Sequence, residues 1–419
     1  MDLELVTIGT ELLLGFTIDT NAAHLGRALA SVGARVVRRT TVGDEGTTIG
    51  DAVRQALGRT GFVIATGGLG PTRDDVTKKV VADLFGAPLE VDRAYLEVLR
   101  ARFARLGRAM PAINRSQAEV PRGAVVLPNR WGTAPGLWLE GPPGTVVMLP
   151  GVPREMQGLL EHEVLPRVQS RISGAGRPAV VTASRTLRTT GIAESALAER
   201  IGDLEDGMAP ATLAYLPGVD GVDLRLTVWN LPADLANRTL ADRADLLRPA
   251  LGTHLYGEGD ADLAAVVLSL LRDQRLTLAV AESCTGGLLG ARLTAVPGSS
   301  DVVVGGVVAY ANAVKTAHLG VSVEVLQREG AVSEPTVRAM ARNVAQRFGT
   351  RAGIAVTGIA GPGGGTPEKP VGTVWIAAVL EDRQEAVQRR FPGDREDVRR
   401  RSAQAALDLM RRLLQGQPA

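Results

Sequence analysis

Short apolar runs alternate with amphipathic segments along the first 160 residues. The runs at residues 3–8 and 62–65 predict buried strands, since each is short, aliphatic and followed by glycine or polar residues. Apolar spacing typical of a helix predicts helices over residues 21–32 and 72–85, each closed by a glycine. Strands that alternate with helices in this way predict a largely parallel α/β sheet.

The pattern changes twice further along the chain. Residues 171–178, RISGAGRP, are rich in glycine, proline and polar side chains and predict a linker. A β-α-β-β-α pattern follows over residues 180–251, and from Asp260 an amphipathic helix leads into an apolar strand at residues 276–281. We therefore expect an α/β multidomain protein, divided as 1–170, 178–256 and 260–416.

Composition and charge narrow the function classes. The 419 residues carry 47 Lys and Arg against 45 Asp and Glu, a balance that argues against a protein that coats nucleic acid. One cysteine and four scattered histidines exclude an intrachain disulfide and make a zinc centre improbable. The N-terminal residues lack the basic start of a signal peptide, and the apolar runs are too short to span a membrane. We expect a cytoplasmic protein with no nucleic-acid or membrane partner.

The stretch TGGLGPTRDD, residues 66–75, lies between a predicted strand and a predicted helix. Gly67, Gly68 and Gly70 allow the backbone to approach a ligand, and the helix N-terminus favours an anion such as a phosphate. The alternative is that this stretch only caps the helix, because Thr72 and Asp75 have the spacing of a capping box.

Three carboxylates in this region predict a divalent cation. Asp74 and Asp75 follow the glycines directly, and Asp44 follows the preceding predicted strand. Since the carboxyl ends of parallel strands meet at one edge of a sheet, we expect these three acids to lie together and to bridge a metal ion to phosphate.

In the last domain a strand runs into AESCTGGLLG, which places Ser283 at a strand–turn–helix junction. Backbone N–H groups of Cys284, Thr285 and Gly286 are expected there and can hold an oxyanion. The serine needs a base, and Lys315 is a candidate, with Tyr310 beside it.

Two alternatives to this serine mechanism stay open. Ser283 can serve only as a helix N-cap. Cys284, with His318 as its base, is a rival nucleophile, unless the thiol is a small packed hydrophobe. After the strand at residues 353–356, Thr357 and Gly358 open a second glycine-rich loop, where ligand contacts collect. The basic run Arg399 to Arg401 is expected to be a solvated face, with contact to a nucleotide phosphate as the alternative.

The motifs GTELLLG…DTN, VGDE, TGGLGPTRDD and PGVPREM resemble the molybdopterin-binding-like domain of the CinA family. The resemblance implies metal-dependent hydrolysis of ADP-ribose with Mg²⁺ or Co²⁺. It assigns Gly67, Gly68 and Gly70 to the phosphate loop, and Asp44, Asp74 and Asp75 to the acidic positions. An Asp74–Asp75 pair replaces the Arg-Asp of molybdenum-cofactor proteins, which favours a metal–diphosphate ligand over molybdopterin. The alternative is a nucleotide- or pterin-binding regulatory module without catalysis.

The motifs AESCTGG, AYANAVK and VTGIAGPGGGTPEKPVGTV resemble the C-terminal amidohydrolase domain of the same family. The resemblance implies deamidation of nicotinamide mononucleotide to nicotinate mononucleotide and ammonia, with no cofactor. Ser283 is then the nucleophile and Lys315 the base with Tyr310 beside it, while Thr285, Gly286, Thr357 and Gly358 contact the substrate or the oxyanion. The resemblance also implies a small KH-like module in between, and a homodimer. The nucleic-acid KH module needs a GXXG loop, which this acidic segment lacks, so we expect a scaffold or dimerisation role.

Overall fold

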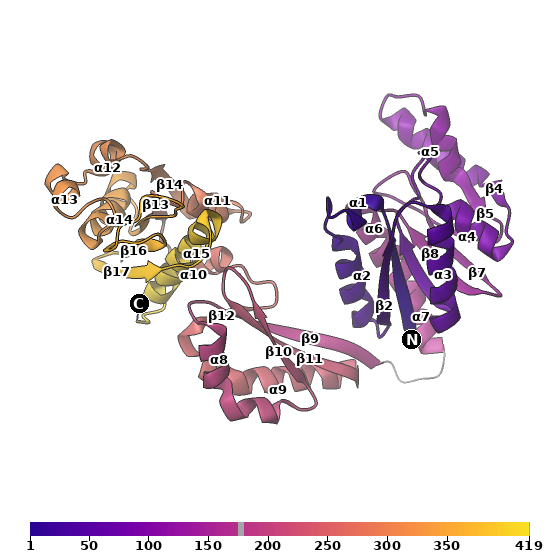
Figure 1. Cartoon of the computed structure of the whole chain (residues 1–419), viewed down its shortest axis with the longest axis horizontal. Coiled ribbons are helices and arrows are strands. Elements are labelled where there is room, and N and C mark those ends of the chain that lie inside the picture. The colour runs from indigo at the N-terminus through magenta and orange to yellow at the C-terminus, as the bar shows by residue number, and fades with distance from the viewer. Residues whose placement is uncertain (175–179, 419) are drawn as a thin grey trace. The chain divides into compact units, whose positions relative to one another are not determined.

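The computed structural model describes residues 1–174 and 180–418. The chain divides into two compact units, one formed by Met1–Ala183 with Val228–Arg238 and the other by Ser184–Thr227 with Thr239–Ala419. Figure 1 labels the elements along the chain. No helix in the described ranges combines the length and the apolar character that crossing a lipid bilayer requires.

The first unit is built on a six-stranded sheet with the strand order β2-β1-β3-β8-β7-β6. Its first four strands are parallel and its last two antiparallel, which confirms the expected parallel sheet for the part nearest the motifs. The strands of the sheet are β1 (Asp2–Ile8), β2 (Arg35–Val42), β3 (Phe62–Thr66), β6 (Val125–Leu127), β7 (Gly136–Gly141) and β8 (Gly144–Leu149).

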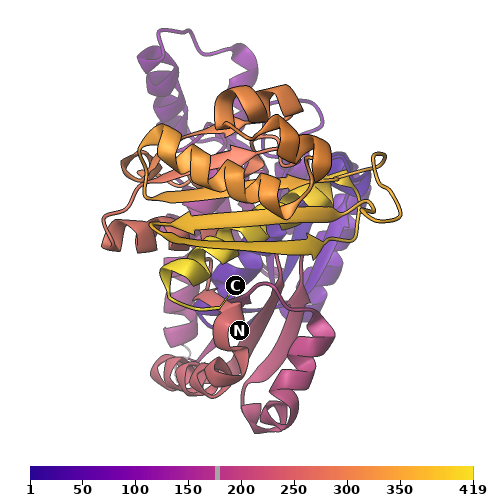
Figure 2. The same ribbon diagram turned by 90° about the vertical axis from the view of Figure 1, so that its left-hand side faces the viewer.

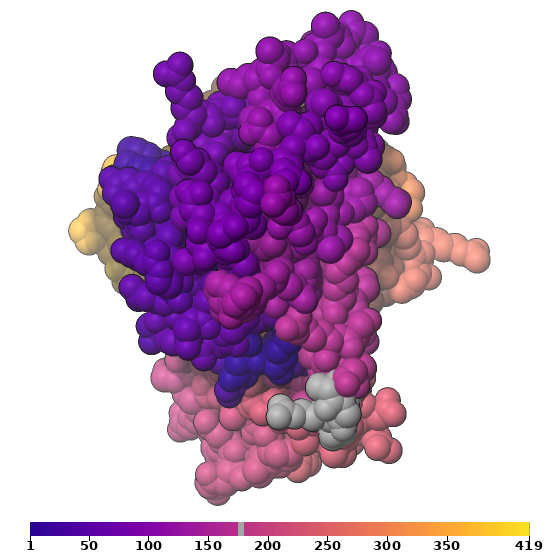
Figure 3. Space-filling view, turned by 90° about the vertical axis from the view of Figure 1, so that its right-hand side faces the viewer, coloured from indigo at the N-terminus to yellow at the C-terminus, as the bar shows by residue number. Residues whose placement is uncertain are grey.

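Helices cover both faces of this sheet and form two separate cores. The alternation along β1 explains this division, because Leu3 and Leu5 face one core while Val6 and Ile8 face the other. The helices and the small β4-β5 sheet are α1 (Thr10–Leu13), α2 (Thr20–Ser31), α3 (Gly46–Thr60), α4 (Thr77–Phe85), β4 (Leu89–Val91), α5 (Arg93–Arg105), β5 (Glu119–Pro121), α6 (Pro153–Leu159) and α7 (Leu165–Gly174). The segment that carries α5 forms one end of this unit (Figures 1 and 3).

Two expectations for this unit need correction. The helix predicted from Thr72 begins at Thr77, because the Asp75 carboxylate accepts hydrogen bonds from Thr72 and so closes a loop rather than a helical turn. The predicted linker at 171–178 is helical up to Gly174, where α7 ends. The rest of that linker, residues 175–178, lies outside the described residues.

Next along the chain is a module around a four-stranded sheet of order β10-β11-β9-β12, most of which belongs to the second unit. It follows the predicted β-α-β-β-α pattern and adds one further strand. The elements are β9 (Val180–Thr189), α8 (Glu194–Ile201), β10 (Thr212–Pro217), β11 (Val222–Pro232), α9 (Ala233–Leu251) and β12 (Leu255–Glu258).

The C-terminal domain is a five-stranded sheet of order β14-β13-β15-β16-β17, in which β14, β13 and β15 are parallel. Its strands are β13 (Leu278–Glu282), β14 (Val303–Val308), β15 (Ala352–Gly358), β16 (Thr373–Leu380) and β17 (Arg383–Arg390). Its helices are α10 (Leu263–Asp273), α11 (Leu288–Thr294), α12 (Asn312–Leu319), α13 (Val323–Arg328), α14 (Glu334–Phe348) and α15 (Arg395–Leu414).

Residue size differs between the two faces of this sheet. On one face Val280, Ile354 and Ile376 pack against α10, α11 and α15. On the other face Ala281 and Ala355 leave room for α14 to lie close to the strands. Figure 2 shows α14 and α15 on opposite faces of the sheet. Strand β13 contributes side chains to both cores, and Ser283 follows this strand directly.

Candidate active site

Ser283 is the first residue after β13, an interior strand of the sheet, as the sequence predicts. Its backbone N–H donates to the carbonyl of Val356 on β15, at 2.9 Å, so the serine is tied to the neighbouring strand. The chain then turns through Gly286 and Gly287, whose φ angles of 60° and 98° favour glycine. Helix α11 starts directly afterwards, which confirms the strand–turn–helix junction.

Lys315 lies on α12, the helix that follows β14, and its side chain reaches Ser283. Its Nζ lies 3.1 Å from Ser283 Oγ and donates to the carbonyl of Ala309 at 2.8 Å and to that of Tyr310 at 3.3 Å. A neutral amine has two N–H donors and one lone pair. With both donors directed at the carbonyls, the lone pair is free to accept the proton of the serine hydroxyl.

Burial favours the neutral form of this amine. Lys315 is 1% exposed, and burial lowers its pKa from the usual value of 10.5. Among the described residues no carboxylate lies within ion-pair distance of Nζ to counter this effect. The pair therefore has the two properties that a serine nucleophile requires, hydrogen-bond contact with a base and a base whose proton is weakly held.

The turn after Ser283 offers two free backbone donors. The N–H of Gly286, one of the three predicted oxyanion donors, donates instead to the carbonyl of Ser283 at 3.1 Å. Within the described part of the chain, no backbone carbonyl accepts a hydrogen bond from the N–H groups of Cys284 and Thr285. These two groups are the oxyanion donors that the geometry leaves available.

Glu282 is a site residue that the motif analysis missed. Its buried carboxylate accepts hydrogen bonds from three backbone N–H groups, those of Gly287 and Leu289 at 3.0 Å and that of Gly290 at 2.8 Å. A carboxylate is stabilised at the positive end of a helix. Glu282 therefore fixes the turn that carries Ser283 to the start of α11. Its position directly before the serine was the available signal.

Tyr310 takes a different place from the one expected. Its side chain is 60% exposed, and its hydroxyl is bonded to Arg395 at 2.7 Å. Only its backbone carbonyl reaches Lys315. The hydroxyl therefore does not lie beside the Lys315 amine as expected, but beside a guanidinium at the start of α15.

Two arginines of α15 border the turn. Arg395 also donates to the carbonyl of Gly361, and Arg399 donates to the carbonyl of Thr285 at 3.0 Å. Arg399 forms an ion pair with Glu396, whereas Arg395 has no carboxylate partner among the described residues. The positive charge of Arg395 is thus uncompensated next to the site.

The rival thiol nucleophile is disfavoured by the surroundings of Cys284. The thiol packs into the core, and burial raises its pKa to about 12, so it stays protonated at neutral pH. His318, the suggested base, lies on the exposed part of α12. Cys284 is therefore better explained as a small packed hydrophobe.

Thr357 and Gly358 form the end of β15 rather than the start of an open loop. The hydroxyl of Thr357 donates to the carbonyl of Ala331, so it fixes a neighbouring loop. A Cβ on Gly358 would come within 2.8 Å of the Thr373 carbonyl on the paired strand. Thr285 differs from them, because its buried hydroxyl has no partner in the described structure and is free to meet a ligand.

In the first unit the glycines of TGGLGPTRDD pack against the protein itself. A Cβ on Gly67 would lie 2.1 Å from the Ile8 carbonyl, one on Gly68 2.2 Å from the Thr77 hydroxyl, and one on Gly70 2.4 Å from Asp75. Close packing at the carboxyl ends of β1 and β3 thus accounts for these glycines. Their predicted contact with phosphate stays a prediction.

The three acids of this region are each engaged separately. Asp44 accepts hydrogen bonds from the backbone N–H and the hydroxyl of Thr10, at 2.9 and 2.8 Å. Asp75 accepts hydrogen bonds from the backbone N–H and the hydroxyl of Thr72. Asp74 is exposed. No group of three His, Cys, Asp or Glu side chains in the described ranges is arranged to hold a metal ion. As they stand, the three carboxylates do not fit a shared cation.

A small cavity of about 90 Å³ does open at the same sheet edge. It joins residues of several motifs, and its polar lining comprises Thr7, Glu11, Thr17, Asp19, Thr20, Asn21 and Thr66. Asn21 donates to the carbonyl of Gly151, in the PGVPREM turn. The motifs GTELLLG, DTN, TGG and PGVPREM therefore meet at the carboxyl ends of the parallel strands, where α/β sheets bind ligands.

Comparison with known families accounts for nearly the whole chain. The CinA C-terminal domain family matches residues 260–414, the family described as "Probable molybdopterin binding domain" matches residues 4–170, and the "Damage-inducible protein CinA KH domain" matches residues 184–257. A CinA-like protein of Gemmatimonas aurantiaca is 58% identical over 414 residues, covering 98% of this chain and 96% of its own.

The chain belongs to the CinA family.

One further relative matches the chain over almost its full length, and a solved structure matches part of it. A CinA-like protein of Salinibacter ruber is 44% identical, covering 99% of this chain and all of its own. A solved structure of a competence/damage inducible protein from Agrobacterium tumefaciens is 40% identical over 35% of this chain and 90% of its own, with a TM-score of 0.35. The CinA assignment confirms the three-part α/β architecture, with a molybdopterin-binding-like start, a KH-like middle and a CinA C-terminal domain.

Proposed function

We propose that the C-terminal domain is an amidohydrolase that deamidates nicotinamide mononucleotide to nicotinate mononucleotide and ammonia. The observation that carries this proposal is the buried Lys315 amine 3.1 Å from Ser283 Oγ, held by two carbonyls with its lone pair free. The motif resemblance to the CinA amidohydrolase domain supports the substrate. Neither the serine nor the lysine needs a cofactor for this reaction.

The proposed chemistry has two halves. Ser283 Oγ attacks the carboxamide carbon while Lys315 takes the hydroxyl proton, and the N–H groups of Cys284 and Thr285 hold the oxyanion. Lys315 then returns this proton to the amide nitrogen, the C–N bond breaks and ammonia leaves. In the second half water attacks the acyl ester, Lys315 takes a proton from the water and passes it to Ser283 Oγ, and nicotinate mononucleotide is released.

Arg395 supports a phosphorylated substrate. Its guanidinium bonds to the Tyr310 hydroxyl and the Gly361 carbonyl, both neutral, so its charge is available to a phosphate. Tyr310 connects this arginine to the catalytic pair, since the backbone of the same residue bonds to Lys315. The alternative assignment of a phosphate contact to Arg399 is weaker, because Arg399 is paired with Glu396.

Ammonia release from nicotinamide mononucleotide by the full chain tests this proposal. We expect multiple turnovers, and we expect the rate to be the same with and without EDTA, because the derived steps use only protein groups. Nicotinamide riboside, which has the carboxamide, the pyridinium ring and the ribose but no phosphate, is the matched control and should react far more slowly. The absence of ammonia release from the mononucleotide would contradict the proposal.

As a second candidate, we propose that the first unit cleaves ADP-ribose. The convergence of four motifs on the cavity at the ends of β1 and β3 favours a ligand there. The family resemblance implies a divalent metal, but the three carboxylates do not share a site in the described structure. AMP formation from ADP-ribose with Mg²⁺ or Co²⁺, abolished by EDTA, is expected. Binding of ADP-ribose without AMP formation would favour the regulatory alternative.

A further inference from the structure

A second cavity in the C-terminal unit has no part in the proposed amidase. It measures about 540 Å³ and lies between the KH-like module and helix α15 with strand β17. This size is within the range of small-molecule sites, about 300–1,000 Å³. One wall carries residues 190–193, 219–221 and His254 of the module, and the other carries residues 387–392 and one side of α15.

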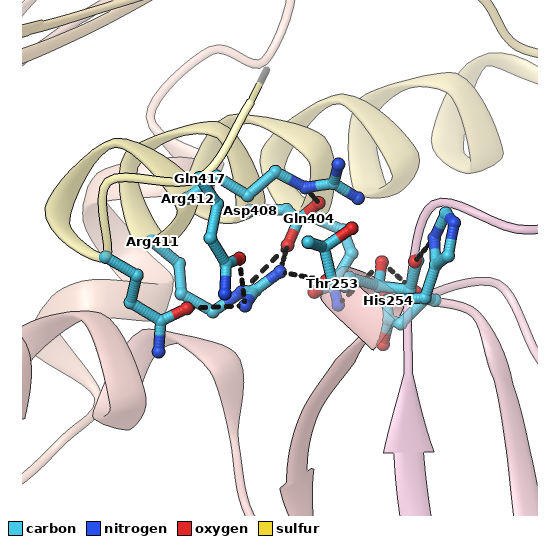
Figure 4. A network of polar contacts seen from close by, with 10 residues as sticks. Thr253, His254, Gln404, Asp408, Arg411, Arg412 and Gln417 are labelled. Atoms are coloured by element: carbon cyan, nitrogen blue, oxygen red, sulfur yellow. Dashed lines mark hydrogen bonds and ion pairs between the residues drawn. The ribbon is translucent and has the colours of Figure 1, made fainter. Parts of the chain in front are cut away.

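A polar network joins the two walls at one end of the cavity. Asp408 on α15 accepts hydrogen bonds from Arg411 and from Arg412 at 2.6 and 2.8 Å, and Arg411 also donates to the carbonyl of Thr253 in the module. Figure 4 shows these side chains beside Thr253 and His254. The contacts fix the module against α15, so the two walls of the cavity are held together.

The charge of the lining is strongly positive. Both acids of the lining are already paired, Asp408 with two arginines and Asp220 with Arg400. Among the described residues, no carboxylate pairs with the three remaining arginines of the lining, which are Arg389, Arg390 and Arg401. Successive residues of a strand face opposite sides of a sheet, so Arg389 lies on the same side of β17 as the cavity-lining Val387, whereas Arg390 lies on the side of Ala386. The unpaired guanidinium groups of Arg389 and Arg401 favour an anion, and guanidinium is well matched to phosphate.

A buried carboxamide adds a specific hydrogen-bonding group. Gln404 is 3% exposed and lines the cavity, and its Nε2 donates to the hydroxyl of Thr190. Because that hydroxyl donates in turn to the Asp220 carbonyl, it must accept from Gln404, which leaves Oε1 as the free atom. Oε1 has no partner in the described structure, and neither does Nε of Arg401. Buried polar atoms are rarely left unpaired, so a ligand donor is missing here.

The remaining lining is apolar. Phe391 and Pro392 follow β17, and Val387, Ala405 and Leu409 contribute aliphatic surface. A ligand that satisfies all three features carries a phosphate, a hydrogen-bond donor and a flat or apolar body. We propose that this cavity is a binding site for a nucleotide, with its phosphate at Arg389 and Arg401 and a donor of its base or sugar at Gln404.

Hydrogen–deuterium exchange of the full chain with AMP tests this site separately from any nucleotide bound elsewhere. We expect AMP to protect peptides that cover residues 387–392 and 401–409, and to do so at lower concentrations than inorganic phosphate. Equal protection by phosphate alone would overturn the nucleotide assignment. No protection of these peptides by AMP would overturn the site itself.

Charge variants localise the effect. Arg389→Gln removes an exposed guanidinium with no carboxylate partner among the described residues, and the fold should tolerate it, whereas Arg401→Gln removes the partly buried one. Each should raise the AMP concentration for half-maximal protection by at least about fivefold. Arg347→Gln makes the same charge change at an exposed position on α14 and should leave it unchanged. If Arg389→Gln and Arg401→Gln both behave like Arg347→Gln, the proposal is wrong.

Discussion

The two motif-rich regions of this chain differ in how deeply their polar side chains are buried and in whether these side chains contact one another. Around Ser283 the polar groups are buried and converge, since a lysine, a glutamate and a serine from two crossovers share one turn. At the edge of the first sheet the acids stay near the surface, and both Asp44 and Asp75 bind a threonine close by. Both regions carry glycine-rich motifs after a parallel strand. A glycine-rich motif after a parallel strand therefore marks an edge of the sheet, whereas buried polar side chains that lie close together indicate a catalytic site.

The largest expected contrast comes from Lys315→Met. Removal of the base should lower ammonia release by about 10²–10⁴-fold, the usual contribution of a positioned general base. Lys79→Met, an exposed lysine of the first unit, is the control and should leave the rate unchanged. Rates from a coupled ammonia assay measure both. A Lys315→Met protein that is folded and fully active would show that Lys315 is not the base of the amidase.

The pH dependence of the amidase tests the assignment of Lys315 as the base. Only the neutral amine of Lys315 accepts a proton, so activity should rise with pH by about tenfold per unit below the pKa of this amine. Burial lowers that pKa, which places the midpoint of the rise below the ordinary lysine value of 10.5. The profile of kcat/KM against pH gives the midpoint. A rate that falls as pH rises through neutrality would contradict the assigned base.

Glu282→Gln tests the support of the catalytic turn. The amide keeps one acceptor oxygen and loses the charge that faces three N–H groups. The free energy of unfolding should fall by about 1–3 kcal/mol, and kcat should fall more than KM changes. Urea denaturation and steady-state kinetics measure the two effects. The exposed Glu324→Gln serves as control, and equal behaviour of the two variants would mean that Glu282 does not hold the turn.

The smallest effect is expected in the first unit. Asp75→Ala frees the backbone and hydroxyl of Thr72, so the loop loses order. ADP-ribose affinity should fall by about fivefold, corresponding to about 1 kcal/mol, while ammonia release stays unchanged. Isothermal titration measures the affinity, with the exposed Asp51→Ala as control. A loss of ammonia release in Asp75→Ala would show that the two regions are not independent.

The sequence predicted those features that depend on neighbouring residues and on the parallel sheet. The strand before Ser283 and the helix that carries Lys315 follow from local patterns, and parallel strands bring their ends to one edge. The contact between Lys315 and Ser283 was therefore predictable. The capping role of Glu282 was also within reach, since an acid directly precedes the turn.

Other features depend on tertiary paths that no local pattern encodes. Arg395 reaches Tyr310 across 85 positions of the chain, and this contact turns the tyrosine hydroxyl away from its predicted role. Thr357 looked like a ligand contact because it follows a strand, but its hydroxyl holds the Ala331 loop. Asp75 accepts a hydrogen bond from Thr72 and so closes a loop before α4, which therefore begins only at Thr77.

The central claim is that Ser283, and not the adjacent thiol, is the nucleophile of the proposed amidase. Its most direct test compares ammonia release from nicotinamide mononucleotide by Ser283→Ala and Cys284→Ala. The account predicts a loss of about 10³-fold or more for the serine variant and a change within about threefold for the cysteine variant. Wild-type turnover by Ser283→Ala, or complete loss of turnover in a folded Cys284→Ala protein, would contradict it.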